Sequence, residues 1–311
     1  MLKYLFKRFI ILLITLFIIV TLTFFLMKAM KGSPFNNPKL SLENLLVLKK
    51  QYGLDKPEWQ QYLLYLKNIV TGDLGVSFQY SNQSVTTLLL QRLGVSIQLG
   101  FQALILGIGL GMLAGSFAAL HHRTKIDHLL SFVSTLAYSI PSFIIAVFLL
   151  NSFGYRLQLL PVSGWGSFLQ TILPTIALAI PPFAIISRFV RAEMLETLHS
   201  DYILLARAKG LTKHQITNQH VYRNSIIPVL TVIGPMAANL LTGSVLVERI
   251  FSIPGIGEQF VNSISSNDYP VIMGTTIVYA IILMVMILLT DIAISLFDPR
   301  VRLQQGAYHG R

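Results

Sequence analysis

The strongest constraint on the fold is a set of apolar runs that are long enough to cross a bilayer. Six such runs occur, and none of them contains Lys or Arg. A helix needs about 20 apolar residues to cross the hydrocarbon core. These runs do not alternate polar and apolar residues as the strands of a membrane barrel do. We therefore predict an all-α polytopic membrane protein with six transmembrane helices. The spans are predicted at residues 9–27, 97–120, 129–150, 168–186, 229–247 and 271–296.

The first run is predicted to be a retained span rather than a secretory signal. The apolar part of a signal is about 7–15 residues long and ends at a small-residue cleavage site. Residues 9–27 exceed that length, and the run ends in Phe24, Phe25, Leu26 and Met27.

Composition excludes several functional classes. Only 12% of the 311 residues are charged, whereas a soluble domain has about 25%. The net charge is +11 in spite of this low content of charged residues. A nucleic-acid-binding protein would need many more Lys and Arg residues, so no nucleic-acid partner is expected. The absence of cysteine excludes a disulfide scaffold, a thiolate metal site and a cysteine nucleophile.

The basic residues indicate the orientation. Of the 24 Lys and Arg residues, 14 lie on the side that holds both termini and the loops at 121–128 and 187–228. The short loops on the other side hold only Arg156 and Arg249, and the other eight lie in the long segment 28–96. Short loops rich in Lys and Arg stay in the cytoplasm. Both termini are therefore predicted to be cytoplasmic.

Three regions follow from this topology. Residues 1–27 form the N-terminal tail and the first span, and residues 28–96 form an extracytoplasmic subdomain with helical patterns at 41–50 and 59–69. Residues 97–311 form a five-helix core. Its second predicted span carries Gly107, Gly111 and Gly115 on one face, a spacing that favours close helix contact, although glycine is generally enriched in membrane helices.

The cytoplasmic segment 187–228 predicts a helix, a glycine turn and a second helix. The first helix begins at Asp201, where the helix dipole favours an acid, and ends at Gly210, which suits a left-handed position. Thr212 and Gln215 form a capping-box pattern for the second helix, and Pro228 follows where the fifth span begins. The same pattern also fits a solvated basic loop near anionic lipid.

The outer loop before the last span contains Pro254, Gly255 and Gly257 between apolar residues. An apolar loop of this kind is expected to fold back against the spans rather than lie free in water. We predict a short interfacial helix at residues 257–265 and treat the three loop residues as gate candidates. A simple turn is the alternative.

The sequence has no catalytic, cofactor-binding or metal-binding motif. It lacks the Gly-Lys pair of a phosphate loop, the H-x-x-x-H pattern of a zinc helix and the G-x-S-x-G elbow of a hydrolase. We therefore predict that the chain is not an enzyme. Asp291 is the only carboxylate within the predicted spans, and its place near the cytoplasmic end favours a structural role over proton coupling.

Taken together, the motifs resemble those of a known family. The markers are Tyr52–Pro57, Gly72–Ser77, Leu160–Gly164, Asp201–Leu211, Arg223–Pro228 and Ile253–Gly257. In this order they resemble the membrane-spanning permease subunits of binding-protein-dependent ABC importers, in the dipeptide, oligopeptide and nickel branch. The chain is most like the B subunit of oligopeptide permeases. One departure is the segment Arg92–Ser96, where the family often has Pro followed two residues later by Thr.

The resemblance implies the type I permease fold of ABC importers (MetI-like) in the cell membrane (plasma or inner membrane) of a prokaryote. It implies a second permease subunit, two cytoplasmic ATPase subunits and an extracytoplasmic substrate-binding lipoprotein as partners, with lipid around the spans. No cofactor is expected on this chain, because ATP and Mg would bind to the ATPase subunits. The substrate would be an oligopeptide, with dipeptides or nickel chelates as alternatives.

The resemblance also assigns the cytoplasmic segment 201–228 to the loop that docks in a groove of the ATPase. The residues carried over are Asp201, Ala206, Arg207, Ala208, Lys209, Gly210, Leu211 and Pro228. Small side chains at Ala206, Ala208 and Gly210 would let the loop approach the partner's backbone closely. A secondary transporter that uses Asp291 for proton coupling, and a membrane scaffold without transport, are the alternatives.

Overall fold

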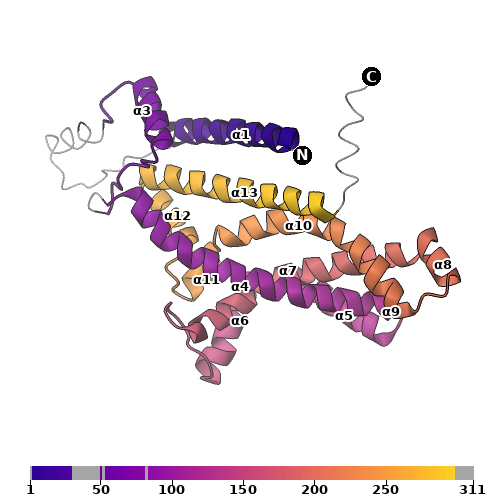
Figure 1. Cartoon of the computed structure of the whole chain (residues 1–311). Coiled ribbons are helices and arrows are strands. Elements are labelled where there is room, and N and C mark those ends of the chain that lie inside the picture. The colour runs from indigo at the N-terminus through magenta and orange to yellow at the C-terminus, as the bar shows by residue number, and fades with distance from the viewer. Residues whose placement is uncertain (1, 30–49, 51–52, 81–82, 298–311) are drawn as a thin grey trace.

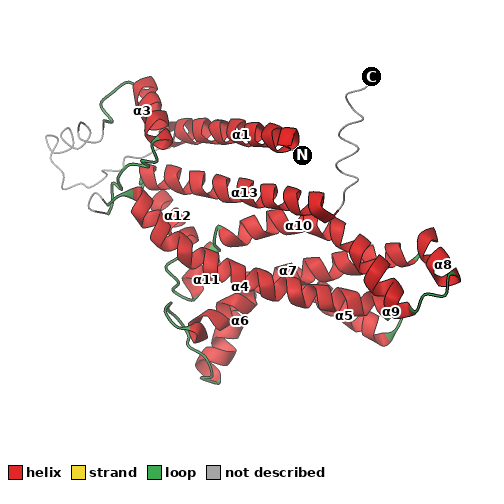
Figure 2. Ribbon diagram, viewed as in Figure 1, coloured by secondary structure: helices red, strands yellow, loops and turns green. Residues whose placement is uncertain are grey.

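The computed structural model describes residues 2–29, 50, 53–80 and 83–297. Within these residues every regular element is a helix, and the bridged pair Val76 and Ser84 is isolated (Figure 2). The α-helices are α1 (Leu2–Ala29), α3 (Glu58–Val70), α4 (Val85–Leu120), α5 (Lys125–Ser139), α6 (Ser142–Leu149), α7 (Phe168–Leu198), α8 (Asp201–Ala208), α9 (Lys213–Ile216), α10 (Tyr222–Leu241), α11 (Val245–Ile250), α12 (Ile256–Ser265) and α13 (Tyr269–Phe297). Two π-helical turns follow α6 and α9, namely η1 (Leu150–Arg156) and η2 (Thr217–Val221).

The spans agree with the prediction in number when one bent pair is counted as a span. Five segments are long and apolar enough to cross a membrane, namely residues 8–29, 85–120, 168–198, 213–250 and 269–294. The sixth consists of α5 and of α6 with η1, which meet at 98°. The helix expected at residues 41–50 lies outside the described residues except for Lys50.

The third span, predicted at residues 129–150, is broken at Pro141. Pro141 has no backbone N–H, and its ring disfavours helical geometry at the preceding residue. Ile140 accordingly adopts an extended conformation, with φ −94° and ψ 121°. The chain therefore turns sharply between α5 and α6 instead of crossing straight.

Several span boundaries also differ from their predicted positions. The helix of the second span begins at Val85 rather than at residue 97, so the expected boundary at residue 96 falls inside α4. Its first turns carry Arg92 but pack Val85 and Leu89 against Ile256 and Val271. Tertiary packing thus extends a helix that hydropathy alone ends earlier.

The ends of the fourth and fifth spans also differ from their predicted positions. Helix α7 continues to Leu198, and Pro228 lies inside α10 rather than before it. The expected fifth span is interrupted at Gly243, where φ is +86°, before α11 begins. Much of the predicted cytoplasmic loop is therefore helical.

The centre of the molecule is the contact between α4 and α7. Glycine residues at positions 107, 111 and 115 of α4 face α7 directly, as their spacing predicted. A Cβ atom at Gly107 would lie 2.6 Å from the carbonyl oxygen of Ala179, and one at Gly111 would lie 2.9 Å from that of Phe183. The absence of side chains is what allows the two backbones to approach so closely.

Several shorter helices lie at the two ends of this central pair, and α10, α13 and α1 run alongside it (Figure 1). Helices α8 and α9 lie at one end, and α3, α11 and α12 lie at the other. Helix α1 runs beside α13 at one edge, and Arg8 of α1 forms an ion pair with Asp291 of α13. The N-terminal end of α1 and the C-terminal end of α13 both point toward the end that carries α8 and α9.

Candidate functional site

The segment from α8 to α9 forms the predicted helix–turn–helix. Gly210 follows α8 with φ +81°, a conformation that costs glycine little. Its N–H donates to the carbonyl of Arg207 (2.9 Å), and the N–H of Leu211 donates to that of Ala206 (3.3 Å). These two bonds are those of a Schellman motif, which ends a helix by satisfying its last carbonyls.

The start of α9 has the capping box that the sequence indicated. The Thr212 hydroxyl accepts from the N–H of Gln215 (3.3 Å), and the N–H of Thr212 donates to Oε1 of Gln215 (2.9 Å). Because both ends of the turn are bonded, the direction of α8 relative to α9 is fixed by the local sequence.

Helix α8 has one face inside the protein and one face outside. Ile203 and Ala206 are buried in a cluster with Met194 of α7. Tyr202, Leu204 and Leu205 are exposed, with 67% of Leu204 and 55% of Leu205 accessible. The other candidate residues of this segment are exposed (Asp201, Arg207, Ala208, Lys209 and Gly210) or partly exposed (Leu211 and Pro228).

The small side chain of Ala206 therefore packs inside the chain itself. We expected this residue to approach a partner's backbone, but its side chain is only 6% exposed. The outward apolar face of α8, which we call the α8 patch, consists instead of Tyr202, Leu204 and Leu205. An apolar surface on a helix beyond the spans is typical of a protein interface.

A buried ion pair holds the same end of the molecule together. Asp127, near the start of α5, is 3% exposed. One of its carboxylate oxygens accepts a hydrogen bond from Nε of Arg191 on α7 (2.6 Å). Its other oxygen accepts hydrogen bonds from a second guanidinium nitrogen of Arg191 (2.9 Å) and from the backbone N–H of Arg123 (3.0 Å). This bidentate arrangement links the turn between α4 and α5 to α7, and neither residue was singled out in the sequence.

A basic cavity of about 630 Å³ lies behind the helix–turn–helix. Arg207, Lys213, His122 and His199 line it, together with apolar residues from the ends of α4 and α7. Two of the basic residues of this segment, Arg207 and Lys213, thus border the same cavity while remaining exposed.

The predicted outer-loop residues surround a buried carboxylate. Glu248 on α11 is fully buried, and its carboxylate accepts from Ser96 Oγ of α4 (2.7 Å) and from the N–H of Glu258 in α12 (2.9 Å). Added Cβ atoms at Gly255 and Gly257 would meet this carboxylate, while Pro254 precedes the loop's turn into α12. The loop therefore folds back on the spans, and its helix begins at Ile256 as α12.

Glu248 is a residue that sequence reasoning missed. It stands one residue beyond the predicted end of the fifth span, where hydropathy places it in a loop. The usable signal was a single acid between an apolar run and a glycine-rich loop. Its carboxylate lies at the N-terminus of α12, where unsatisfied N–H groups and the helix dipole favour negative charge.

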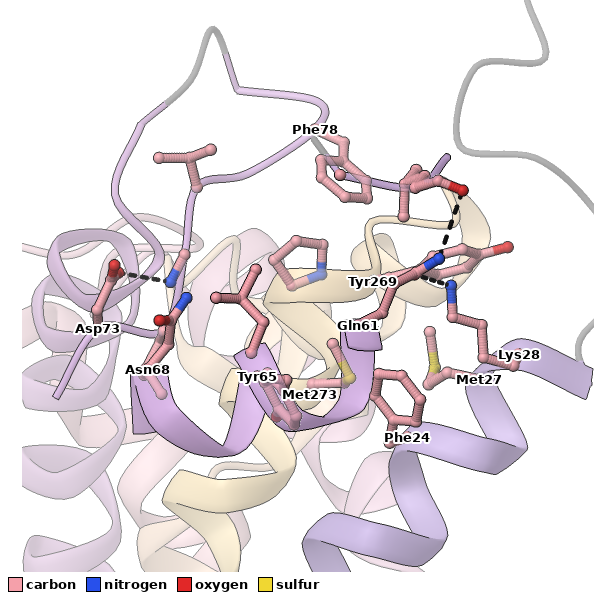
Figure 3. A pocket seen from close by; sticks show the side chains of 17 residues that line it. Phe24, Met27, Lys28, Gln61, Tyr65, Asn68, Asp73, Phe78, Tyr269 and Met273 are labelled. Atoms are coloured by element: carbon pink, nitrogen blue, oxygen red, sulfur yellow. Dashed lines mark hydrogen bonds between the residues drawn. The ribbon is translucent and has the colours of Figure 1, made fainter. Parts of the chain in front are cut away.

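A pocket of about 280 Å³ lies at the end that carries α3, between α1, α3 and α13. Figure 3 shows Phe24, Tyr65 and Met273 along it, with Asp73 and Lys28 at opposite ends. Lys28 donates to Gln61, and Asp73 accepts from the backbone of its own turn. Burial raises the pKa of the Tyr65 phenol above its ordinary value, because the apolar surroundings disfavour the charged phenolate.

Other candidate chemistry is accounted for by structural contacts. Asp291 binds Nε of Arg8 at 2.7 Å, as expected for a structural role. Within the described ranges, no group of three or more His, Asp or Glu could hold a metal ion. His122 faces Asp127 at 3.2 Å instead.

Helices that are long and apolar enough to cross a membrane, with a helix–turn–helix at one end, define a polytopic membrane protein. Residues 107–303 match the family described as "Binding-protein-dependent transport system inner membrane component", and residues 1–100 match its N-terminal companion family. The chain therefore belongs to the family of binding-protein-dependent transport system inner membrane components.

Relatives and a solved structure agree with this assignment. DppB, a dipeptide transport system permease protein, is 59% identical over 97% of this chain and 100% of its own length in Lactococcus lactis subsp. cremoris, and 43% identical over 98% and 99% in Bacillus subtilis. The oligopeptide transport system permease protein OppB of Escherichia coli K12 is 37% identical over 97% and 100%. The fold resembles that of a chain in an inward-facing structure of the MetNI methionine ABC transporter, with TM-score 0.55 and 17% identity over 68% of this chain and 97% of the other.

The chain is thus a membrane-embedded permease component of a bacterial ABC importer. Such importers have partner ATPases, which are separate subunits, and a substrate-binding protein. The fold is the type I (MetI-like) permease fold. The proton-coupled alternative that used Asp291 has no support from the family or from the ion pair of that residue.

Proposed function

We propose that this chain forms one half of the pathway through which an ATP-driven importer moves short peptides. The relatives that are named for dipeptide and oligopeptide transport cover nearly the whole chain, which supports this substrate class. The other half of the pathway is a second, similar permease subunit. Two ATPase subunits bind ATP and Mg, and an extracytoplasmic binding lipoprotein delivers the peptide.

In this proposal the end with α8 and α9 faces the cytoplasm, together with both termini. The distribution of Lys and Arg supports this orientation because short loops rich in these residues are retained inside. The opposite end, with α3, the outer pocket and the loop over Glu248, then faces the binding protein. Residues 28–96 supply part of that docking surface, and Pro254, Gly255 and Gly257 close the outer side of the spans.

The α8 patch is the observation that carries the coupling role. Leu204 and Leu205 lie exposed on a short helix whose opposite face and both ends are fixed to the rest of the chain. A rigidly held apolar face can transmit a push or pull from a docked partner to α7 and α10. The ATPases dock there, and their ATP-driven closure rocks the spans between inward- and outward-facing states. The exposed Arg207 and Lys209 add charge complementarity at the rim.

The test replaces Leu205 with Asp in the full importer. We expect ATPase subunits to be lost from the purified complex and peptide uptake to fall at least tenfold, because a charge is desolvated where an apolar contact forms. Co-purification and uptake in proteoliposomes measure the two effects.

The matched control is Leu63→Asp on α3, because Leu63 is also 55% exposed but lies at the other end of the molecule. This variant should retain its ATPases. If Leu205→Asp also kept its ATPases and transported peptide normally, the coupling role of the α8 patch would be wrong.

A further inference from the structure

A groove lies between α7 and α10 within the membrane-spanning part of the chain. Its volume is about 460 Å³, and it runs from Ile185 on α7 to Ser244 at the start of α11, with Ser142 of α6 at its wall. Both helices belong to segments that are long and apolar enough to cross the bilayer. The groove is therefore a cavity at membrane depth.

The three polar side chains of the groove have no partner within the described part of the chain. Ser142, Asn239 and Ser244 make no side-chain hydrogen bond there, and Asn239 is exposed. Other hydroxyls in the spans, such as those of Ser134 and Thr275, donate to the carbonyl four residues earlier. Unpaired polar groups are costly in hydrocarbon, so an amide and two hydroxyls that share one cavity indicate a polar occupant.

The backbone of the groove supplies a further acceptor. Three prolines line it, namely Pro181, Pro182 and Pro235. Because proline has no N–H, the carbonyl of Leu178, a lining residue four positions before Pro182, lacks its helical donor. None of the twelve lining residues is charged. The groove thus offers neutral donors and acceptors along an apolar wall.

We propose that this groove binds the main chain of the transported peptide, with Asn239 as the central contact. A peptide main chain presents neutral N–H and C=O groups, which an amide side chain can bind from both its donor and its acceptor side. Contacts of this kind do not depend on the peptide's side chains, and an uncharged wall neither selects nor repels charged ones. The inference rests on the proposed peptide-transport function.

The absence of cysteine from the chain allows a direct test. Asn239→Cys is compared with Val285→Cys, a residue that is 47% exposed on the apolar α13. In proteoliposomes of the full importer, a hydrophilic methanethiosulfonate reagent should modify Asn239→Cys and leave Val285→Cys unmodified, because only a hydrated thiol forms the reactive thiolate. A transported dipeptide should slow the modification of Asn239→Cys at least fivefold.

A second measurement separates binding from assembly. Asn239→Leu should keep its ATPases but lose at least tenfold in uptake, and Asn239→Gln should recover most of that uptake. Equal modification of Asn239→Cys with and without dipeptide, or normal uptake by Asn239→Leu, would overturn the inference while leaving peptide transport intact. A wild-type importer that moved no peptide would instead overturn the proposed function.

Discussion

At the scale of single residues, the structure explains charges that a membrane protein of this composition should avoid. Glu248 is fully buried but serves as an acceptor for Ser96 and for the first turn of α12. Asp127 is almost as buried and binds Arg191 in a bidentate manner. Each carboxylate links elements that are distant in the sequence. These contacts offset the free-energy cost of burying its charge.

Removal of the Asp127 charge should therefore destabilise the end of the molecule that carries α8 and α9. We expect Asp127→Asn to lower the free energy of unfolding by about 2 kcal/mol, because the buried site would lose the charged acceptor of the hydrogen bonds from Arg191 and Arg123. Thermal unfolding of the purified chain in detergent measures the effect.

The exposed Asp201→Asn is the control and should leave stability within about 0.5 kcal/mol of wild type. The double variant Asp127→Asn with Arg191→Gln should be more stable than the sum of the two single variants predicts. Strict additivity would contradict the importance of this pair.

At the scale of elements, glycine spacing decides how α4 packs. A Cβ at Gly111 would lie 2.9 Å from Ile186 and from the carbonyl of Phe183, whereas a Cβ at Gly109 on the same helix meets nothing within 4 Å. The two glycines thus differ in packing but not in helical context.

The same substitution at these two positions should have opposite effects. Gly109→Ala should be neutral or stabilise by up to about 1 kcal/mol, because alanine has the higher helix propensity. Gly111→Ala should destabilise by about 1–3 kcal/mol, because α4 and α7 would be forced apart. Thermal unfolding of the two variants compares them, and equal stability would mean that the α4–α7 contact is looser than the structure shows.

At the scale of the whole molecule, the proposed orientation places α3 outside and α8 inside the cell. Val70 at the end of α3 is 87% exposed, and Leu204 on α8 is 67% exposed. In spheroplasts, an impermeant thiol reagent should modify Val70→Cys and should reach Leu204→Cys only after the membrane is opened. The reverse pattern would invert the topology and with it the site of ATPase docking.

The sequence by itself determined the helical membrane class, the approximate place of each span and the local design of the α8–α9 turn. These follow from hydropathy, from the missing Cβ of Gly210 and from the Thr212–Gln215 capping box, all of which act within a few residues. Only the tertiary structure decided the inward face of Ala206, the burial of Glu248 beneath Gly255 and the groove beside Asn239. Each of these depends on side chains that are distant in the sequence, and hydropathy and spacing along one chain do not specify which helix faces meet.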